Sequence, residues 1–439
     1  MTERVCLISL GCAKNLVNSE QMLYQIAEAG YELCAEPELA AAVVINTCGF
    51  IDAAKSEAIE TILENAALKN EEGYPKIVVT GCLSERYKDG IFEELPEVDA
   101  LVGVGSFGKI TDALEDVFAG RRVSRYGDIS APLDETPRIV STGPSWAYLK
   151  IADGCDNRCS YCAIPDIRGS FRSRTMENIL REARELAADG VKELIIIAQD
   201  ITRYGLDLYG ERRLGELLRE LCGISELEWI RLHYLYPDEI DDDLIDVIAS
   251  EEKIVKYLDI PIQHISDELL RRMNRRGTGG EIRDLFGKLR ERIPGVVLRT
   301  SLIVGFPGEG DEEFEELCEF LREFEIERAG VFSFSPEEGT AAAEMPEQVP
   351  GETAERRAEL VGEIQYDIIQ EFCASRIGRT LRALCEGEDA ETGMHWGRSP
   401  ADSPDIDGRV LWTGSGSPGE FAEVEITDTK NGDLIGVAI

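Results

Sequence analysis

Three closely spaced cysteines are the first candidates for binding a metal cofactor. Cys155, Cys159 and Cys162 occur in the stretch DGCDNRCSYCAIP, where their spacing is CxxxCxxC. Tetrahedral iron or zinc usually takes four protein ligands, and no nearby His or Cys supplies a fourth. Three thiolates suit a [4Fe–4S] cluster in which one iron keeps an open position, as catalytic metal sites do. The alternative is a zinc knuckle whose fourth ligand comes from a distant part of the chain.

A second set of three cysteines shares a place at the end of a predicted strand. Cys12, Cys48 and Cys82 occur in SLGCAK, NTCGF and TGCLS, each just after an apolar run and before a helix-like segment. The carboxyl ends of parallel strands meet at one edge of a sheet, so we expect the three thiols to converge. They could bind a second cluster with an open iron, or they could be buried cysteines that act as small apolar side chains.

Alternating strand and helix patterns predict the elements that position both sets of cysteines. Over residues 1–120, short β-branched runs alternate with helix-like segments, which is typical of a Rossmann-like parallel α/β domain. Residues 121–140 lack periodicity and predict a linker. About six further strand–helix units over residues 141–371 predict a partial (β/α)6 barrel of the TIM type. Short strands between Gly, Asp and Ser turns predict a small antiparallel β-barrel over residues 374–439.

Composition and charge restrict the class of partner. The 439 residues carry 85 acidic and 46 basic side chains, a formal net charge of −39. Nucleic-acid binders neutralise phosphates with Lys and Arg, so a chain this acidic favours a basic protein partner. No apolar run is long enough to span a membrane, and the first residues contain no cleavage site of a signal peptide. We therefore expect no membrane partner and a cytoplasmic location, where thiols stay reduced.

These motifs resemble those of the methylthiotransferases, a family of radical S-adenosylmethionine enzymes. The similarity covers essentially the whole chain and rests on LGCAKN, NTCGFI, GCLSER, CxxxCxYCAIPxxRGxxRSR, LDIPIQH and FPGE. It implies two [4Fe–4S] clusters, one bound by each set of three cysteines. It also implies that S-adenosyl-L-methionine fills the open iron position of the cluster on the CxxxCxxC motif. In this family the terminal barrel is a TRAM domain, which is OB-like.

Within the family, the sequence is similar to the branch that modifies an aspartate of ribosomal protein S12. The stretches IPDIRGSFRSR, AQDITRYG, LHYLYP, SPEEGTAA and GRSPADSPDIDG carry this similarity. It implies methylthiolation of the aspartate β-carbon, with S-adenosylmethionine as radical source and methyl donor and with an electron donor such as flavodoxin or ferredoxin. Breaking a strong C–H bond lies beyond side-chain acids and bases, so we expect no catalytic side chain beyond the cluster ligands.

Two alternative functions remain open at this point. The first is a methylthiotransferase that acts on adenosine in transfer RNA, and the second is an iron–sulfur electron carrier or sensor. The charge of the terminal barrel bears on the first, because residues 374–439 hold six basic and twelve acidic side chains, a net charge of −6. A barrel that binds RNA should be basic, whereas this one suits a basic ribosomal protein. No direct nucleic-acid specificity is therefore expected.

Five further residues are predicted to bind S-adenosylmethionine. Gln199 and Asp200 end a predicted strand where, by the resemblance, the amino group of the cofactor is held, although they could instead cap a turn. Arg168 is expected to bind a carboxylate of the cofactor or substrate, unless it pairs with a surface acid. Tyr161 precedes the last cysteine of CxxxCxxC, and Gly305 lies in SLIVGFPGE, which could cradle the cofactor or form a turn.

Overall fold

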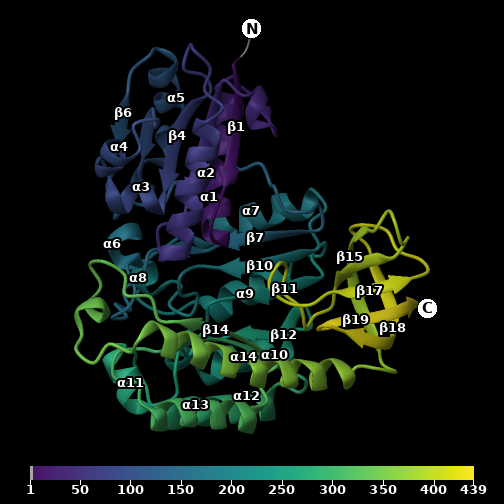
Figure 1. The fold of residues 1–439 in the computed structure, drawn as a ribbon. Coiled ribbons are helices and arrows are strands. Elements are labelled where there is room, and N and C mark those ends of the chain that lie inside the picture. Colours follow the sequence, from purple (N-terminus) through teal and green to yellow (C-terminus); the bar gives the residue numbers. More distant parts are fainter. Residues whose placement is uncertain (1–2) are drawn as a thin grey trace. The chain divides into compact units, whose positions relative to one another are not determined.

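A computed structural model describes residues 3–439, so the first two residues of the predicted 1–120 domain lie outside the described range. The chain divides into two units, and each combines segments that are far apart in the sequence (Figure 1). The first unit contains the residues up to Ser141, Ala152–Arg174 and Ser335–Ala343. The second unit contains Thr142–Ile151, Thr175–Phe334 and Glu344–Ile439.

A six-stranded parallel sheet forms the framework of the first unit. In spatial order its strands are β2 (Glu32–Cys34), β1 (Arg4–Ser9), β3 (Ala42–Thr47), β4 (Lys76–Gly81), β5 (Ala100–Val102) and β6 (Val123–Arg125). Every neighbouring pair in this sheet is parallel. β6 lies within the predicted linker 121–140, and β2 was not predicted. The Rossmann-like class predicted for this part of the chain is confirmed.

Helices cover both faces of this sheet, because its central strands are apolar on both sides. Val43 and Ile45 of β3 pack with Ile62 of one helix, whereas Val44 packs on the opposite face with Met22 of another. The helices of the first unit are α1 (Ala13–Glu28), η1 (Pro37–Leu39), α2 (Asp52–Ala66), α3 (Cys82–Tyr87), α4 (Gly90–Glu94), η2 (Val104–Lys109), α5 (Ile110–Phe118) and α6 (Ile164–Arg168). A short antiparallel pair, β8 (Ala152–Asp153) and β9 (Arg172–Ser173), encloses the CxxxCxxC segment in the sequence.

A second six-stranded parallel sheet forms the barrel part of the second unit. In spatial order its strands are β7 (Trp146–Lys150), β10 (Glu193–Ile197), β11 (Trp229–Leu232), β12 (Ile254–Asp259), β13 (Val297–Val304) and β14 (Arg328–Ser333). Its helices are α7 (Met176–Ala188), α8 (Leu206–Tyr209), α9 (Leu214–Cys222), η3 (Pro237–Glu239), α10 (Asp242–Ser250), α11 (Asp267–Arg272), α12 (Gly279–Arg292) and α13 (Asp311–Phe324). Strand order follows sequence order, which confirms the predicted partial (β/α)6 barrel.

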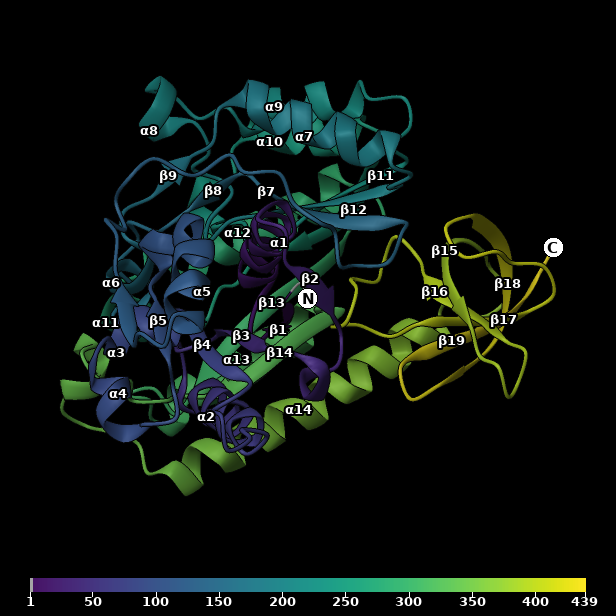
Figure 2. The ribbon, with the colours of Figure 1, turned by 90° about the horizontal axis from the view of Figure 1, so that it is seen from above.

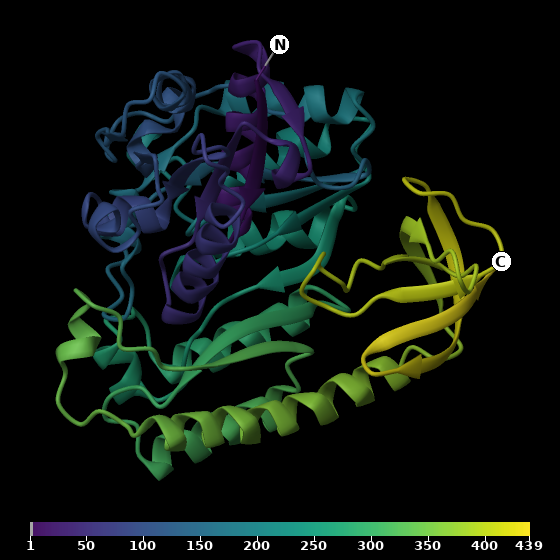
Figure 3. The same ribbon diagram turned by 45° about the horizontal axis from the view of Figure 1, so that its top comes forward.

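One long helix, α14 (Gly351–Ala374), follows the barrel sheet and packs beside β14 (Figure 3). The 3-10 helix η4 (Ala341–Glu344) precedes it in the chain. Among residues 3–439, no helix has the length and apolar character that a membrane span requires.

The C-terminal strands close into a small barrel, seen in yellow in Figure 2. In spatial order they are β15 (Thr380–Glu388), β16 (His395–Arg398), β17 (Val410–Thr413), β19 (Asp433–Ala438) and β18 (Phe421–Lys430). The predicted barrel is confirmed, with one difference in pairing: β17 and β19 are parallel, whereas the other pairs are antiparallel. Trp412 and Cys385 are fully buried in its core.

A connecting segment of the C-terminal barrel, residues 399–407, packs against strands of the (β/α)6 barrel. Asp402 accepts a hydrogen bond from Arg328 of β14 at 2.7 Å, and both side chains are buried. Asp407 accepts a hydrogen bond from the hydroxyl of Tyr257 of β12, also at 2.7 Å. The two barrels of the second unit therefore share a buried network of polar groups.

Candidate iron–sulfur and cofactor site

Cys12, Cys48 and Cys82 follow three neighbouring strands of the first sheet. The strands are β1, β3 and β4. Cys12 directly precedes α1, Cys48 directly follows β3, and Cys82 is the first residue of α3. The Cys48 thiol interacts electrostatically with both Cys82 and Cys12, so the three side chains lie close together. The predicted convergence of these thiols is confirmed, while their binding of iron stays a prediction.

Two glycines allow the chain to bring these cysteines together. A Cβ atom on Gly11 would lie 2.8 Å from the Cβ of Cys48, and one on Gly81 would lie 2.4 Å from the side-chain oxygen of Asn46. Both glycines have positive φ angles, +87° and +95°, a conformation that other residues rarely adopt. Larger residues at either position would therefore push apart the segments that carry the thiols.

Buried amides tie the cysteine-bearing segments to one another. The side-chain NH2 group of Asn15 donates to the carbonyls of Leu10 at 3.0 Å and Thr47 at 2.9 Å, and so it joins the ends of β1 and β3. The NH2 group of Asn46 donates to the Asn15 carbonyl at 2.9 Å. These contacts hold the first turn of α1, which begins at Ala13, against the ends of β1 and β3. Sequence reasoning missed both asparagines.

The guanidinium of Arg168 lies at the first set of cysteines and is fully buried. One of its NH2 groups donates to the two carboxylate oxygens of Asp153 at 3.1 and 2.9 Å. The other donates to the side-chain oxygen of Asn15 at 2.7 Å and to the sulfur of Cys82 at 3.7 Å. The acid that pairs with Arg168 is therefore Asp153, a buried residue rather than a surface one. Its predicted contact with a cofactor carboxylate stays a prediction.

Nearby charges determine the ionisation of these thiols. Burial alone would raise the pKa of Cys12, but the charges of Lys14 and Arg168 bring that pKa below its ordinary value. Burial and the neighbouring Cys82 raise the pKa of Cys48 to about 11. Burial also raises the pKa of Cys82, although Arg168 opposes the shift. The arginine thus favours the thiolate form at all three positions, and thiolates are the form that binds iron.

The CxxxCxxC segment belongs to the same unit as the first set of cysteines. Its backbone is fixed by hydrogen bonds from the Cys155 amide to the Gly169 carbonyl and from the Cys162 amide to the Cys159 carbonyl, at 3.1 and 3.0 Å. Within residues 3–439, no three His, Cys, Asp or Glu side chains are arranged to hold a single metal ion. Cluster binding by Cys155, Cys159 and Cys162 stays a prediction.

Helix α6, which ends the CxxxCxxC segment, packs directly on the first set of cysteines. Ala163 and Ile167 are buried against Cys82 and Val104. Together with Arg168, these contacts attach the loop of one cysteine set to a residue of the other set.

A segment from far along the chain, residues 335–343, also contacts both cysteine-bearing regions. The buried carboxylate of Glu337 bonds with Lys55 of α2 and Arg86 of α3, at 2.8 and 3.0 Å. The Ala342 amide donates to the carbonyl of Ser160, between Cys159 and Cys162, at 2.8 Å. Sequence reasoning missed Glu337, because a glutamate in SPEEGTAA has no pattern that reveals burial.

The remaining predicted cofactor residues lie at strand ends or in loops. Asp200 accepts hydrogen bonds from the amide and hydroxyl of Thr202, which is the turn-cap arrangement that the sequence left open. Gln199 precedes it, and Tyr161 is partly exposed in the CxxxCxxC segment. Gly305 follows β13 with a φ of +73°, and a Cβ there would lie 2.2 Å from the Cβ of Ala354. The turn and this close packing require glycine at 305, while cofactor contact by these residues stays a prediction.

A buried polar group lies beside Gly305. The Gly305 amide donates to the carboxylate of Glu309 at 2.7 Å, and Arg357 of α14 donates to the same carboxylate at 2.8 Å. The imidazole of His264 lies 3.8 Å from Glu309. Burial and the Arg357 charge lower the pKa of His264 to about 3, so the imidazole is neutral at physiological pH.

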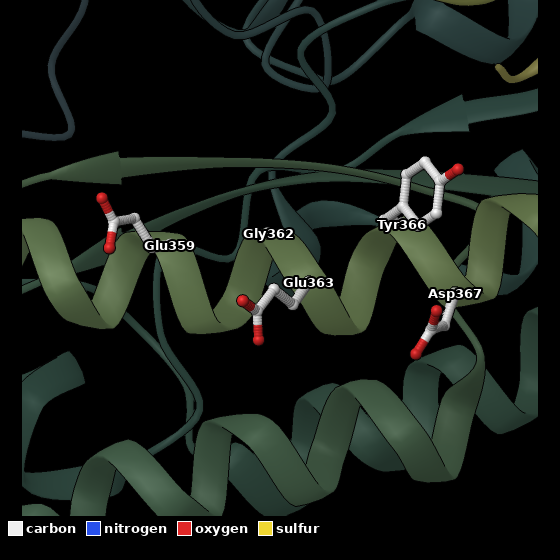
Figure 4. A pocket seen from close by; sticks show the side chains of 5 residues that line it. All are labelled: Glu359, Gly362, Glu363, Tyr366 and Asp367. Carbon is white, nitrogen blue, oxygen red and sulfur yellow. The ribbon is translucent and has the colours of Figure 1, made fainter.

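The hollow along α14 contains none of the predicted site residues. It has a volume of about 610 Å³ and is lined by Glu359, Gly362, Glu363, Tyr366 and Asp367. Figure 4 shows these side chains along the helix, with three carboxylates among them. An acidic hollow on one helix does not suit a cofactor that carries a carboxylate of its own.

Three known protein families match separate parts of the chain. The Radical SAM superfamily matches residues 149–321, which include CxxxCxxC and most of the second sheet. Uncharacterized protein family UPF0004 matches residues 4–103, and the TRAM domain matches residues 377–439. Among solved structures, the radical S-adenosylmethionine methyltransferase TsrM from Kitasatospora setae has a similar fold. Its TM-score is 0.56 at 15% identity, over 88% of this chain and 78% of TsrM. The fold and the family matches define a radical S-adenosylmethionine enzyme.

Curated relatives match over the full length. The ribosomal protein uS12 methylthiotransferase RimO of Acetivibrio thermocellus is 47% identical over 100% of this chain and 99% of its own length. The protein of the same name from Caldanaerobacter subterraneus subsp. tengcongensis is 49% identical, with 98% and 99% covered. The chain belongs to the RimO family of methylthiotransferases.

Proposed function

We propose that the protein methylthiolates the β-carbon of an aspartate in ribosomal protein uS12 and that it does so in the cytoplasm. The observation that carries this proposal is the placement of both cysteine sets in one unit, connected through Arg168 and α6. Two sites so joined can serve one substrate carbon. The RimO relatives, which carry the uS12 activity in their names, support the choice of substrate.

Cys12, Cys48 and Cys82 would bind one [4Fe–4S] cluster, and Cys155, Cys159 and Cys162 would bind the other. The first set fits such a cluster, because a buried cation, Arg168, contacts the Cys82 sulfur and acts electrostatically on Cys12 and Cys48. A cluster held by three thiolates is anionic, so the Arg168 charge suits it. The buried Nε of Arg168 also has no hydrogen-bond partner among residues 3–439 and can donate to a sulfur. When bound, the clusters and S-adenosylmethionine supply the radical and sulfur chemistry.

The side chains of this protein bind and orient rather than exchange protons. Gln199, Asp200 and Gly305 follow strands of the second sheet and would hold S-adenosylmethionine together with Tyr161 and Arg168. Such residues place the reacting groups, and a reaction that starts with hydrogen-atom removal needs no general base. An acidic C-terminal barrel, with a net charge of −6, would attract a basic ribosomal protein. The electron donor we propose is a flavodoxin or ferredoxin.

Iron analysis tests the two-cluster assignment. Anaerobically reconstituted protein should hold about eight irons per chain, and replacing either set of three cysteines by alanine should leave about four. Protein without Cys12, Cys48 and Cys82 should still cleave S-adenosylmethionine to 5′-deoxyadenosine, whereas protein without the other set should not. The control is Cys318→Ala, a buried thiol of α13 that should leave iron unchanged. Full iron content after loss of a whole set would refute the assignment.

Mass spectrometry of the substrate tests the activity. Purified uS12 and transfer RNA are each incubated with the enzyme, S-adenosylmethionine, sulfide and reduced flavodoxin. We expect a methylthio group on one uS12 aspartate and none on RNA. Modified adenosine in place of modified aspartate would assign the protein to the transfer-RNA branch. Intact clusters with neither product and no 5′-deoxyadenosine would instead favour an electron carrier.

A further inference from the structure

Arg168 is the feature from which a further role can be derived. Resting on the proposed function, we infer that Arg168 is a positioning residue that raises the reduction potential of the cluster on Cys12, Cys48 and Cys82. Because Arg168 also bonds with Asp153, it connects the cluster on Cys82 to the CxxxCxxC loop. Arg168 follows the CxxxCxxC cysteines in the sequence, yet it contacts a cysteine of the other set, Cys82.

The positive charge of Arg168 is buried beside the first set of cysteines. Arg168 is fully buried, and its carboxylate partner is the buried Asp153. Charges in such a low-dielectric environment act strongly on their neighbours. Reduction adds one negative charge to a cluster, so a fixed cation in contact with one of its thiolates favours the reduced form. The contact is the 3.7 Å hydrogen bond from Arg168 to the Cys82 sulfur.

The second step is the geometry of the guanidinium fork. One NH2 group is held by Asp153, which leaves the other to bond with Asn15 and the Cys82 sulfur. Hydrogen bonds to sulfur are a principal means by which proteins tune iron–sulfur potentials. The buried Nε, without a partner among residues 3–439, provides one more donor at this position. A lysine would keep the charge but could not reproduce the planar fork.

The third step is the place of both residues in the chain. Asp153 ends β8 and lies two residues before Cys155, and Arg168 ends α6, six residues after Cys162. The ion pair of Asp153 and Arg168 therefore flanks the CxxxCxxC loop on both sides, and its arginine contacts Cys82. A displacement of this loop would move the donor at the first cluster.

The test measures the potential of the first cluster alone. The parent protein carries alanine at Cys155, Cys159 and Cys162, so that its electron paramagnetic resonance signal comes from one cluster. Its midpoint potential is determined by reductive titration, before and after Arg168→Gln. We expect a preference for the reduced form that is at least tenfold weaker, which corresponds to about 59 mV for one electron. Arg168→Lys should restore part of this shift.

A matched control and a second variant keep the test decisive. Arg328→Gln removes another buried arginine of an ion pair, in the second unit, and should leave the potential unchanged. Asp153→Asn keeps the guanidinium but removes its balancing charge, so the potential should rise. If Arg168→Gln does not fold by circular dichroism, the Asp153→Asn result alone decides. Potentials equal to that of the parent would overturn the inference, whereas a parent without iron would instead refute the cluster assignment itself.

Discussion

The carboxylate of Glu337 lies 2.8 Å from the ammonium of Lys55, and the two residues are separated by most of the sequence. The same carboxylate bonds with Arg86 and accepts a hydrogen bond from the Asp52 amide at 2.9 Å, at the start of α2. α2 follows the Cys48 segment, and α3, which contains Arg86, begins with Cys82. One carboxylate therefore fixes the helix that follows Cys48 and the helix that begins with Cys82.

Replacing this carboxylate should destabilise the first unit. Glu337→Gln leaves Lys55 and Arg86 without a buried counter-charge, and breaking such a pair costs about 3 kcal/mol of unfolding free energy. Urea unfolding of the cluster-free protein measures the loss. Glu338→Gln is the control, because its exposed side chain should change the free energy by less than about 0.5 kcal/mol. Equal stability of the two variants would show that the buried pair does not stabilise the fold.

The effect of Glu337 should depend on pH in a defined direction. Burial alone would raise its pKa, but hydrogen bonds from Lys55, Ser335 and Arg86 hold the pKa below the ordinary value of 4.5. A depressed carboxyl pKa stabilises the fold above the unfolded value, and this contribution is lost as the pH falls through the folded value. The stability difference between the protein and Glu337→Gln should therefore be full at pH 7 and shrink below pH 4.5. A difference that grows on acidification would contradict the ion pair.

Gly305→Ala should disrupt the packing of α14 on the loop after β13. The added methyl group would lie 2.2 Å from the Cβ of Ala354, at a φ of +73°. Overpacking and the left-handed backbone together predict a loss of about 3 kcal/mol. Gly287→Ala is the matched control, because this exposed helical glycine has no neighbouring atom within 4 Å. Alanine there should raise the free energy of unfolding by about 0.5 kcal/mol or more. Thermal unfolding measures the stability of both variants. A similar change in stability in the two would contradict the prediction.

His264 should make the protein sensitive to mild acid. Its pKa is lowered from 6.5 to about 3 by burial and by Arg357, so the unfolded chain binds a proton between these values and the folded chain does not. Stability is therefore lost as the pH falls below 6.5, by about 2 kcal/mol at pH 5. The urea midpoints at pH 7 and pH 5 should therefore differ less in His264→Gln than in the unaltered protein. The raised pKa of neighbouring Glu309 stabilises the fold on acidification, but Glu309 is present in both proteins. An equal loss of unfolding free energy from pH 7 to pH 5 in the two proteins would contradict a buried neutral imidazole at 264.

Asp402→Asn tests whether the two barrels of the second unit unfold together. It removes the carboxylate that bonds with Arg328 at 2.7 Å and leaves only the longer pair with Asp407 at 3.6 Å, a loss of up to about 3 kcal/mol. Hydrogen exchange should then become faster in β14 and in β17 alike, because residues 399–407 bond with β14 and lead into β17. Asp405→Asn, at an exposed position of the same segment, should leave both rates unchanged. Faster exchange in only one barrel would show that the segment does not couple them.

The sequence predicted the strands that consist of apolar runs and failed at the short strands on the edges of the first sheet. β3 and β4 consist of continuous β-branched runs, and their burial on both faces follows from that pattern. β2 and β6 contain three residues each and lie at the edges of the sheet, where neither alternation nor burial leaves a signal. β6 consequently fell within the predicted linker.

The candidate site was predictable as far as it depends on spacing and strand ends. Parallel strands bring their carboxyl ends to one edge of the sheet. The convergence of Cys12, Cys48 and Cys82 therefore followed from the apolar run that precedes each cysteine. The partners of Arg168 and Glu337 could not be found in this way. They come from elements brought together by tertiary packing, and charged side chains leave no mark in the sequence that distinguishes a buried position from an exposed one.

The way the first unit incorporates residues 335–343 restricts when the protein can mature. A nascent chain leaves the ribosome from its N-terminus, and its first hundred residues emerge long before this segment has been translated. Until then Lys55 and Arg86 lack their buried anion, and the cysteine loops lack their last backbone restraint. The complete surroundings of these thiols therefore exist only after residues 335–343 have been translated, and truncated translation products would lack them.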